Sequence, residues 1–280
     1  MKKPLIIASL IISFVLSSCS STPSSNSLES ANQNYEVEEY YVYKDDNVRI
    51  YGNLYIPLDK NDNMPVVILS HSANLTSDSM KSYGKRFADA GYIAYAFDFC
   101  GGSNQSRSDG RNDEMTIFSE LEDLKAVVNS ISSLNFIDRD SIYLFGTSQG
   151  GLVSALAADE LKEDIAGLML FYPAFNIADL AKNYADEENN SPFITTLLNY
   201  DVYEHIGTYM GDVLILHGSK DFIVPVEYVN RAAELYQNCE LYIINGASHG
   251  FNRENYAFSD TYDDITWNYV NTYLLERSGH

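Results

Sequence analysis

Two neighbouring segments near the start of the predicted folded region, residues 35–44 and 48–57, alternate apolar and polar side chains. Alternation of this kind predicts strands with one buried face, and the turn-forming cluster Asp45-Asp46-Asn47 between them predicts a β-hairpin. Further along, short segments rich in apolar residues predict more strands, several of them continuous enough to be buried on both faces. These segments are residues 65–70, 92–98, 141–145, 166–172, 212–216 and 240–244.

Helical patterns lie between the later strands, where apolar residues recur at helical spacing or Ala and Leu dominate. Strands that alternate with helices indicate a mostly parallel sheet with helices on both faces. We therefore expect an α/β fold that begins with an antiparallel hairpin. The predicted helices are residues 79–90, 114–132, 151–158, 226–236 and 262–275.

One long segment interrupts this alternation. About forty residues, 173–211, separate two predicted strands where a simple crossover needs far fewer. Because the segment follows the carboxyl end of a strand, where open α/β sheets bind ligands, we expect a cap over the site. Its rings, with Tyr200 and Tyr203 as the predicted substrate-binding residues, would give an aromatic or short acyl group flat apolar walls. The alternative is an enlarged crossover whose rings pack a small core of their own.

The beginning of the chain differs from the rest. A basic pair, a short apolar run and Leu16-Ser17-Ser18-Cys19 follow one another. This arrangement resembles a bacterial lipoprotein signal, so we expect residues 1–18 to be removed and Cys19 to carry the lipid; a plain secretory signal or an uncleaved anchor is the alternative. The Ser/Asn-rich residues 19–34 would tether the folded domain, residues 35–280, to a membrane of the bacterial cell envelope, outside the cytoplasm.

Acidic residues outnumber basic ones by 39 to 18, which gives a formal charge of −21. Such a surface repels nucleic acid, so we expect no nucleic-acid partner. Cys100 and Cys239 are the only cysteines after Cys19, and they are compatible with one disulfide or with two inert thiols. The sequence has no C-x-x-C, no His–Glu metal motif and no phosphate-binding glycine pattern, so we expect neither a metal nor a cofactor.

The pentapeptide Gly146-Thr147-Ser148-Gln149-Gly150 lies between a predicted strand, residues 141–145, and a predicted helix, residues 151–158. A G-x-S-x-G sequence in this position is typical of a nucleophile elbow, a turn so tight that only small residues fit on either side of the serine. The helix that follows directs its N-terminus at the serine, which favours developing negative charge. We therefore predict that Ser148 is a nucleophile; the alternative is an ordinary Gly-rich turn.

A serine hydroxyl needs a base to take its proton and an anion to orient that base. Of five histidines, His249 lies in a loop between glycines after the last predicted strand, and we predict that it is the base. The other four are less suitable: two end buried strands, one lies in the insertion and one is terminal. They are His71, His217, His205 and His280.

The acid is expected after a strand between the serine and the histidine, because this fold places the triad in the order Ser, acid, His. Asp221 satisfies that order, in the loop that follows residues 212–216. Asp179, after the previous strand, is the second choice. Asp98 precedes the serine and is in the wrong order.

Several of these segments together resemble the α/β-hydrolases, in the group with bacterial cinnamoyl and feruloyl esterases, monoacylglycerol lipase-like esterases and serine aminopeptidase-like proteins. The resemblance implies the α/β-hydrolase fold and the triad Ser148, Asp221 and His249. It also implies an oxyanion hole formed by the N–H groups of Gln149 and Ala73. One departure is Ser72, where the family usually has glycine after His71. The matching segments are His71-Ser72, residues 98–103, 146–150, 217–221, 224–225 and 246–251.

The expected activity is hydrolysis of a small-molecule carboxylic ester with a short or aromatic acyl group, through an acyl-enzyme. Peptide or amide hydrolysis is the near alternative, because a triad cleaves both kinds of bond. That reading expects groups that grip a charged N-terminus, such as the acidic run Asp186-Glu187-Glu188. A binding lipoprotein with an inactive hydrolase fold is the alternative from another class of function.

Overall fold

The structure, a computed structural model, describes residues 34–44, 47–59, 61–186, 190–252 and 262–277. The predicted signal peptide, Cys19 and nearly all of the predicted tether lie outside the described residues, as do Asp45 and Asp46 of the predicted hairpin turn. Within the described ranges, no helix is both long and apolar enough to cross a membrane.

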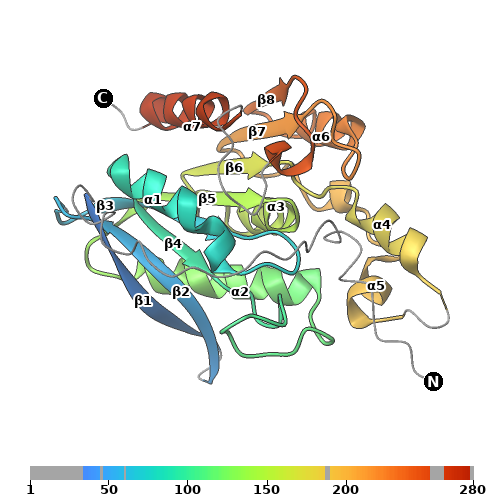
Figure 1. Cartoon of the computed structure of the whole chain (residues 1–280), viewed down its shortest axis with the longest axis horizontal. Coiled ribbons are helices and arrows are strands. Elements are labelled where there is room, and N and C mark those ends of the chain that lie inside the picture. The colour runs from blue at the N-terminus through green and yellow to red at the C-terminus, as the bar shows by residue number, and fades with distance from the viewer. Residues whose placement is uncertain (1–33, 45–46, 60, 187–189, 253–261, 278–280) are drawn as a thin grey trace, which may run out of the picture.

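The centre of the fold is an eight-stranded sheet in the order β1-β2-β4-β3-β5-β6-β7-β8 (Figure 1). β1 pairs antiparallel with β2 and β2 antiparallel with β4, whereas all later pairs are parallel. This is the mostly parallel sheet with an antiparallel N-terminal hairpin that the sequence predicts. The strands are Tyr35–Lys44, Val48–Pro57, Met64–Ser70, Ile93–Phe97, Ile137–Thr147, Gly167–Phe171, Asp212–Gly218 and Cys239–Ile244, β1 to β8 in chain order.

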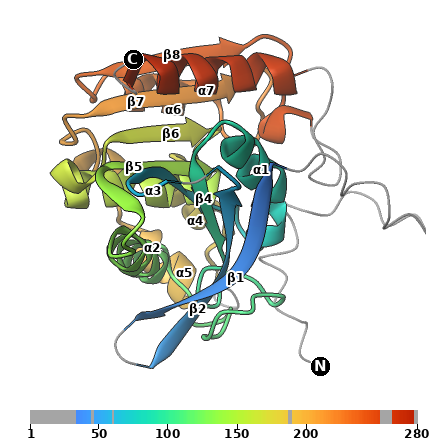
Figure 2. The same cartoon turned by 90° about the vertical axis from the view of Figure 1, so that its left-hand side faces the viewer.

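Helices cover both faces of the sheet (Figure 2). α2 (Ile117–Ser132), α3 (Gln149–Leu161) and α6 (Val226–Ala233) bury their apolar residues in one hydrophobic cluster, on one face. α1 (Lys81–Asp89) and α7 (Asp263–Arg277) contribute to a second cluster on the other face. Because the central strands are covered on both faces, their side chains are almost all buried, which explains their continuous apolar sequences.

Two helices begin at residues other than those predicted. α2 begins at Ile117 rather than at residue 114, because the Thr116 side chain accepts a hydrogen bond from the Ser119 N–H and the Ser119 hydroxyl satisfies the Thr116 N–H in return. The helix predicted from residue 79 starts as the short 3-10 turn η2 (Ser77–Met80) before α1. Two further 3-10 turns, η3 (Lys162–Asp164) and η5 (His249–Asn252), follow α3 and β8.

The long segment between β6 and β7 contains α4 (Ile177–Tyr184), α5 (Pro192–Leu197) and the 3-10 turn η4 (Val202–Glu204). Figure 1 shows α4 and α5 beyond the end of the sheet toward which the arrows of β5 and β6 point. Asp159 of α3 accepts hydrogen bonds from the N–H groups of Gly207 and Tyr209, which fastens the end of the segment to α3. The segment therefore lies at the carboxyl edge of the sheet, as the sequence predicts.

Candidate active site

The pentapeptide turn joins β5 directly to α3, with Ser148 in the strained conformation φ 51°, ψ −116°. The Ser148 N–H donates to the Phe171 carbonyl oxygen at 3.0 Å, which ties the turn to β6. A Cβ atom on Gly150 would lie 2.3 Å from the Ser70 carbonyl oxygen, and one on Gly146 would lie 2.3 Å from the Gly150 carbonyl oxygen. The chain is too close on both sides for any residue but glycine, so the segment has the geometry of a nucleophile elbow.

His249 lies between the serine and an acid. Its Nε2 is 3.1 Å from Ser148 Oγ, and its Nδ1 is 2.7 Å from Asp221 Oδ2. The three side chains come from three turns at the carboxyl edge of the sheet, after β5, β7 and β8. The Tyr172 ring packs edge-on against the imidazole, with 4.8 Å between ring centroids. The structure thus brings together the three residues that the sequence predicts as nucleophile, acid and base.

Asp221 is buried, and its other oxygen, Oδ1, accepts hydrogen bonds from the N–H groups of Ile223 at 3.0 Å and Val224 at 2.9 Å. Burial by itself raises the pKa of Asp221. The hydrogen bond from His249, the charge of His249 and the Val224 N–H lower the pKa by more than burial raises it, so the net pKa lies below its usual value. The carboxylate is therefore ionised at neutral pH and can stabilise a positive imidazolium.

Three of the four rejected histidines make contacts away from Ser148. His71 Nδ1 donates to the Ser72 carbonyl oxygen at 2.8 Å while Nε2 accepts from the Phe99 N–H at 3.2 Å, so the ring is neutral. His217 Nε2 donates to the Val224 carbonyl oxygen at 2.8 Å. Burial lowers the pKa of both imidazoles. His205 stacks on another ring of the insertion, and His280 lies outside the described residues.

Neither alternative acid reaches His249 in this arrangement. Asp179 lies on α4, where its carboxylate accepts hydrogen bonds from the Tyr228 hydroxyl at 2.9 Å and the Lys182 ammonium at 3.2 Å. Asp98 is fully buried and accepts from the N–H groups of Ser77 and Arg107, which holds the loops after β3 and β4 in place.

The two residues predicted to form an oxyanion hole, Ala73 and Gln149, both line the pocket that contains Ser148. Gln149 is the first residue of α3, so its N–H is one of the donors that a helix N-terminus leaves without an intrahelical acceptor. Ser72, where the family usually has glycine, does not adopt the left-handed backbone conformation that would require glycine. Its Oγ lies 2.9 Å from Thr147 Oγ1, which links this loop to the elbow.

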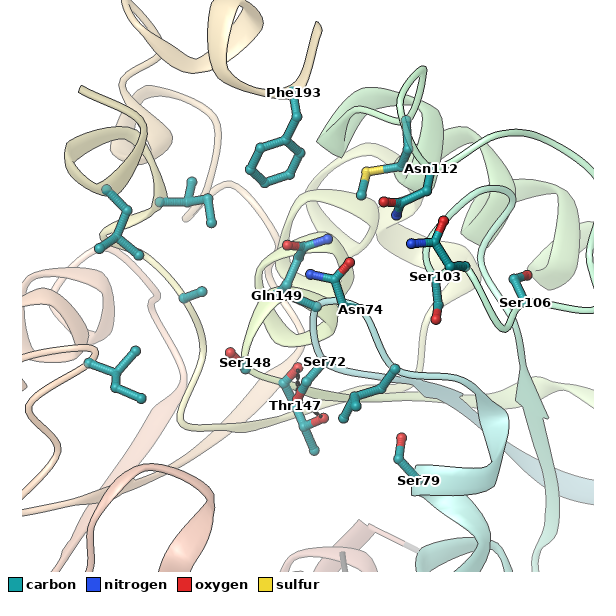
Figure 3. Close-up of a pocket in the computed structure, with 18 of the residues that line it drawn as sticks. Ser72, Asn74, Ser79, Ser103, Ser106, Asn112, Thr147, Ser148, Gln149 and Phe193 are labelled. Carbon is teal, nitrogen blue, oxygen red and sulfur yellow. Dashed lines mark hydrogen bonds between the residues drawn. The ribbon is translucent and has the colours of Figure 1, made fainter. Parts of the chain in front are cut away.

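The pocket has a volume of about 1000 Å³ and two chemically different sides (Figure 3). Figure 3 shows Phe193 at the top of the view, Ser103, Ser106 and Asn112 at the right, and Ser148 at the lower left. The polar side carries hydroxyl and amide groups from the loops after β3 and β4, together with the paired side chains of Arg111 and Asp113. The apolar side comes from the insertion and the loop after β7, with Ile177, Leu180, Phe193, Ile194, Ile223 and Val224.

Tyr200 and Tyr203, predicted as substrate-binding residues, do not line this pocket. The Tyr200 ring stacks on His205 and meets the edge of Phe118 from α2. The Tyr203 hydroxyl donates to the Tyr228 carbonyl oxygen at 3.0 Å, and the Arg231 guanidinium lies 3.8 Å from the ring centroid. These two rings pack the insertion against α2 and α6, so the selection of Tyr200 and Tyr203 was wrong.

Other rings of the insertion face the pocket instead, namely Phe193 and Tyr184. Both belong to the predicted insertion. The sequence carries no signal that separates pocket rings from packing rings, because both kinds are aromatic residues in the same short, irregular segment.

The sequence is compatible with a disulfide between Cys100 and Cys239 or with two thiols. In the structure both are free thiols, and burial raises their pKa values.

A family model described as "Serine aminopeptidase, S33" matches residues 61–188. Two curated Escherichia coli proteins, each named "Uncharacterized 31.7 kDa protein in traX-finO intergenic region", are 28% identical over 137 residues. The matched residues make up 48% of this chain and 46% of each relative, so the chain spans about half the length of the curated relatives it matches.

Solved structures match much more of the chain. Est1E from Butyrivibrio proteoclasticus with bound ferulic acid has a TM-score of 0.75 at 24% identity, over 86% of this chain and 100% of that one. Acetyl xylan esterase from Paenibacillus sp. R4 has a TM-score of 0.68 at 14% identity, over 87% of this chain and 86% of that one. Paleococcus ferrophilus monoacylglycerol lipase has a TM-score of 0.62 at 17% identity, over 81% and 99%. These similarities show the fold, and together with the family match they support a hydrolase.

Proposed function

We propose that this chain, which has the fold of the α/β-hydrolases, hydrolyses carboxylic esters, with Ser148 as nucleophile, His249 as base and Asp221 as the residue that orients the base. One observation carries the proposal: the hydrogen-bonded line from Ser148 Oγ through His249 to Asp221, with separations of 3.1 and 2.7 Å, beside a pocket of about 1000 Å³. Nucleophile, base and orienting acid in this geometry are what acyl transfer to a serine requires.

In the first half of the reaction, His249 Nε2 takes the hydroxyl proton while Ser148 Oγ bonds to the acyl carbon. Negative charge develops on the former carbonyl oxygen, where the N–H groups of Gln149 and Ala73 would stabilise it. The ester C–O bond then breaks, and the alcohol leaves with the proton from His249. Water attacks the acyl-enzyme by the same route, which releases the carboxylic acid and restores the serine hydroxyl.

The two sides of the pocket support a division of the substrate. A short or aromatic acyl group fits against Phe193 and Ile177, whereas the alcohol faces the neutral hydroxyls and amides that include Ser103 and Asn112. The related Est1E was solved with ferulic acid, an aromatic acid. Similarity at this level of identity does not extend to the substrate, so the aromatic acyl group is part of our proposal.

Amide hydrolysis is the second candidate, because the matching family model is described as a serine aminopeptidase. An aminopeptidase needs an anionic group for the substrate ammonium. Among the described residues that line the pocket, Asp113 alone has a carboxylate, and it is held by Arg111, whose Nε donates to Asp113 Oδ1 at 2.9 Å. Glu187 and Glu188 of the predicted acidic run lie outside the described residues. The pocket thus favours an uncharged ester.

Location forms a further part of the proposal. We propose that Cys19 carries a lipid, that residues 1–18 are removed, and that residues 19–34 tether the hydrolase domain to a membrane of the cell envelope. The sequence Leu16-Ser17-Ser18-Cys19 after a short apolar run supports this reading.

A fluorophosphonate, which reacts with activated serines, tests the function directly. The wild-type protein should be labelled and Ser148→Ala should not. With a panel of p-nitrophenyl acetate, methyl ferulate, a monoacylglycerol and an aminoacyl p-nitroanilide, esters should be cleaved and the anilide should not. If Ser148→Ala retained more than about a tenth of the wild-type kcat, the nucleophile would be misassigned. A correctly folded wild-type protein without labelling or turnover would support a non-catalytic binding lipoprotein.

A further inference from the structure

A carboxyl group with no part in the proposed reaction lies directly behind the elbow. Glu120, in the first turn of α2, is only 1% exposed. Its Oε2 accepts a hydrogen bond from Gln149 Nε2 at 2.8 Å. Gln149 follows the proposed nucleophile, is itself buried and lines the pocket. A buried side chain of α2 is thus bonded to the residue whose N–H would stabilise the oxyanion.

The second oxygen of this carboxyl, Oε1, is buried and has no hydrogen-bond partner within the described part of the chain. If Glu120 were ionised, its negative charge would be stabilised by a hydrogen bond at Oε2 only, and Oε1 would be buried without a donor. Burial raises the pKa of Glu120 to about 8, helped by the charge of Asp123 and opposed by the hydrogen bond from Gln149. At neutral pH the group is mostly uncharged, and its carbonyl oxygen accepts from Gln149.

Within the described ranges, the elements packed around Glu120 supply no cation that pairs with it. From α3 it meets the neutral Gln149 amide, and from the loop after β4 it meets Gly102, where an added Cβ would lie 3.4 Å from Oε1. On its own helix, Asp123 forms an ion pair with Lys44 of β1 and accepts from the Cys100 N–H at 2.7 Å. Lys44 is thus paired with Asp123. Asp123 itself carries a negative charge, the same sign as that of an ionised Glu120.

We propose that Glu120, in its uncharged form, is a positioning residue for the reaction: it holds the Gln149 side chain against α2, keeps the first turn of α3 directed at the oxyanion, and stops supporting turnover when it ionises. The inference rests on the proposed ester hydrolysis. Gln149, Ser148 and Asn74 all line the same pocket, so an unrestrained Gln149 amide would swing into the space of the substrate. A negative charge behind the elbow would also oppose the negative charge of the transition state.

The test compares kcat for an ester between pH 6 and pH 9.5 in the wild type and in Glu120→Gln and Glu120→Leu. Glutamine keeps the acceptor oxygen and the shape but cannot ionise. If the ionised form is inactive, kcat follows the fraction of Glu120 that is uncharged. With a pKa of about 8, that fraction is about one thirtieth at pH 9.5, so the wild-type kcat should fall about 30-fold by that pH. Glu120→Gln should keep its kcat over this range. Glu120→Leu, which lacks the acceptor, should lose about tenfold in kcat at every pH with little change in KM.

Glu122→Gln is the matched control, because Glu122 lies on the exposed face of the same helix and pairs with Lys125. It should reproduce the wild-type profile. The proposal would be overturned if the kcat of Glu120→Gln fell at alkaline pH as much as that of the wild type. It would also be overturned if Glu120→Leu had the same kcat as the wild type. If the leucine variant does not fold, the comparison of wild type with Glu120→Gln still decides. Failure of the proposed function looks different: the wild type would then neither turn over esters at pH 7 nor react with the fluorophosphonate.

Discussion

His249 Nε2 lies 3.1 Å from Ser148 Oγ although 101 residues separate them along the chain. Parallel pairing from β5 through β6 and β7 to β8 brings this about, because it places the carboxyl ends of these strands along one edge of the sheet. Backbone hydrogen bonds tie the serine end to β6 and the residues after it: the Ser148 N–H donates to the Phe171 carbonyl oxygen, and the Ala174 N–H donates to the Ser148 carbonyl oxygen at 2.9 Å. The geometry of the pair therefore depends on the whole sheet rather than on either loop.

The choice of acid leads to a first prediction. Asp221→Asn should lower kcat by about a thousandfold or more, because an amide no longer favours the tautomer in which His249 Nε2 accepts the serine proton. The side-chain oxygen that accepts from Ile223 and Val224 is kept, so the melting temperature should change little. Steady-state kinetics and thermal unfolding check both statements.

Asp179→Asn is the control for this change, since Asp179 lies on α4 and bonds to Tyr228 and Lys182. Its kcat should stay within about threefold of the wild type, as surface substitutions away from the site usually do. If Asp179→Asn proved the damaging variant and Asp221→Asn did not, the acid would be wrongly assigned.

The insertion provides a second prediction. Phe193→Ala should reduce kcat/KM for methyl ferulate about fivefold more than for p-nitrophenyl acetate, which corresponds to about 1 kcal/mol for a lost aromatic contact. Tyr200→Ala removes a ring of the same segment that stacks on His205 outside the pocket. It should affect both esters equally or act only on stability. Equal losses on both esters in Phe193→Ala would refute an aromatic acyl site on this side.

A third prediction concerns the stability of the elbow. Gly150→Ala should lower the free energy of unfolding by about 3 kcal/mol or more, because the new Cβ would lie 2.3 Å from the Ser70 carbonyl oxygen and neither backbone can move freely. Gly91→Ala is the matched control, since Gly91 has a φ of +87° but nothing within 4 Å of an added Cβ. It should cost about 1 kcal/mol, from backbone strain alone. Urea unfolding measures both, and equal losses would argue against the close approach.

A fourth prediction addresses location. Cys19→Ser removes the only cysteine of residues 1–34, so it should prevent lipid attachment and either block processing or release the protein from membranes. Labelling of cells with a radioactive fatty acid, followed by membrane fractionation, tests this. Cys239→Ser, at a thiol in the folded domain, should be lipidated like the wild type. Unchanged labelling and fractionation of Cys19→Ser would exclude the lipoprotein reading.

The order of strands and helices and the elbow could be predicted from sequence for one physical reason: each is imposed locally. Continuous apolar runs identify strands buried on both faces, and glycines at 146 and 150 record a turn in which a side chain would collide with the backbone. Asp221 and His249 could be selected because they lie in loops after strands, and parallel strands bring such loops to one edge.

Only the tertiary structure decided which side chains meet the pocket. Tyr200 and Phe193 are both aromatic residues of one insertion, yet one stacks on His205 and the other lines the site, because the packing of α4 and α5 sets which side of each turn faces inward. Glu120 reads in sequence as an ordinary polar position near the start of a helix. Its burial against Gln149 arises because α2 lies across the first turn of α3, and no local pattern records where two helices touch.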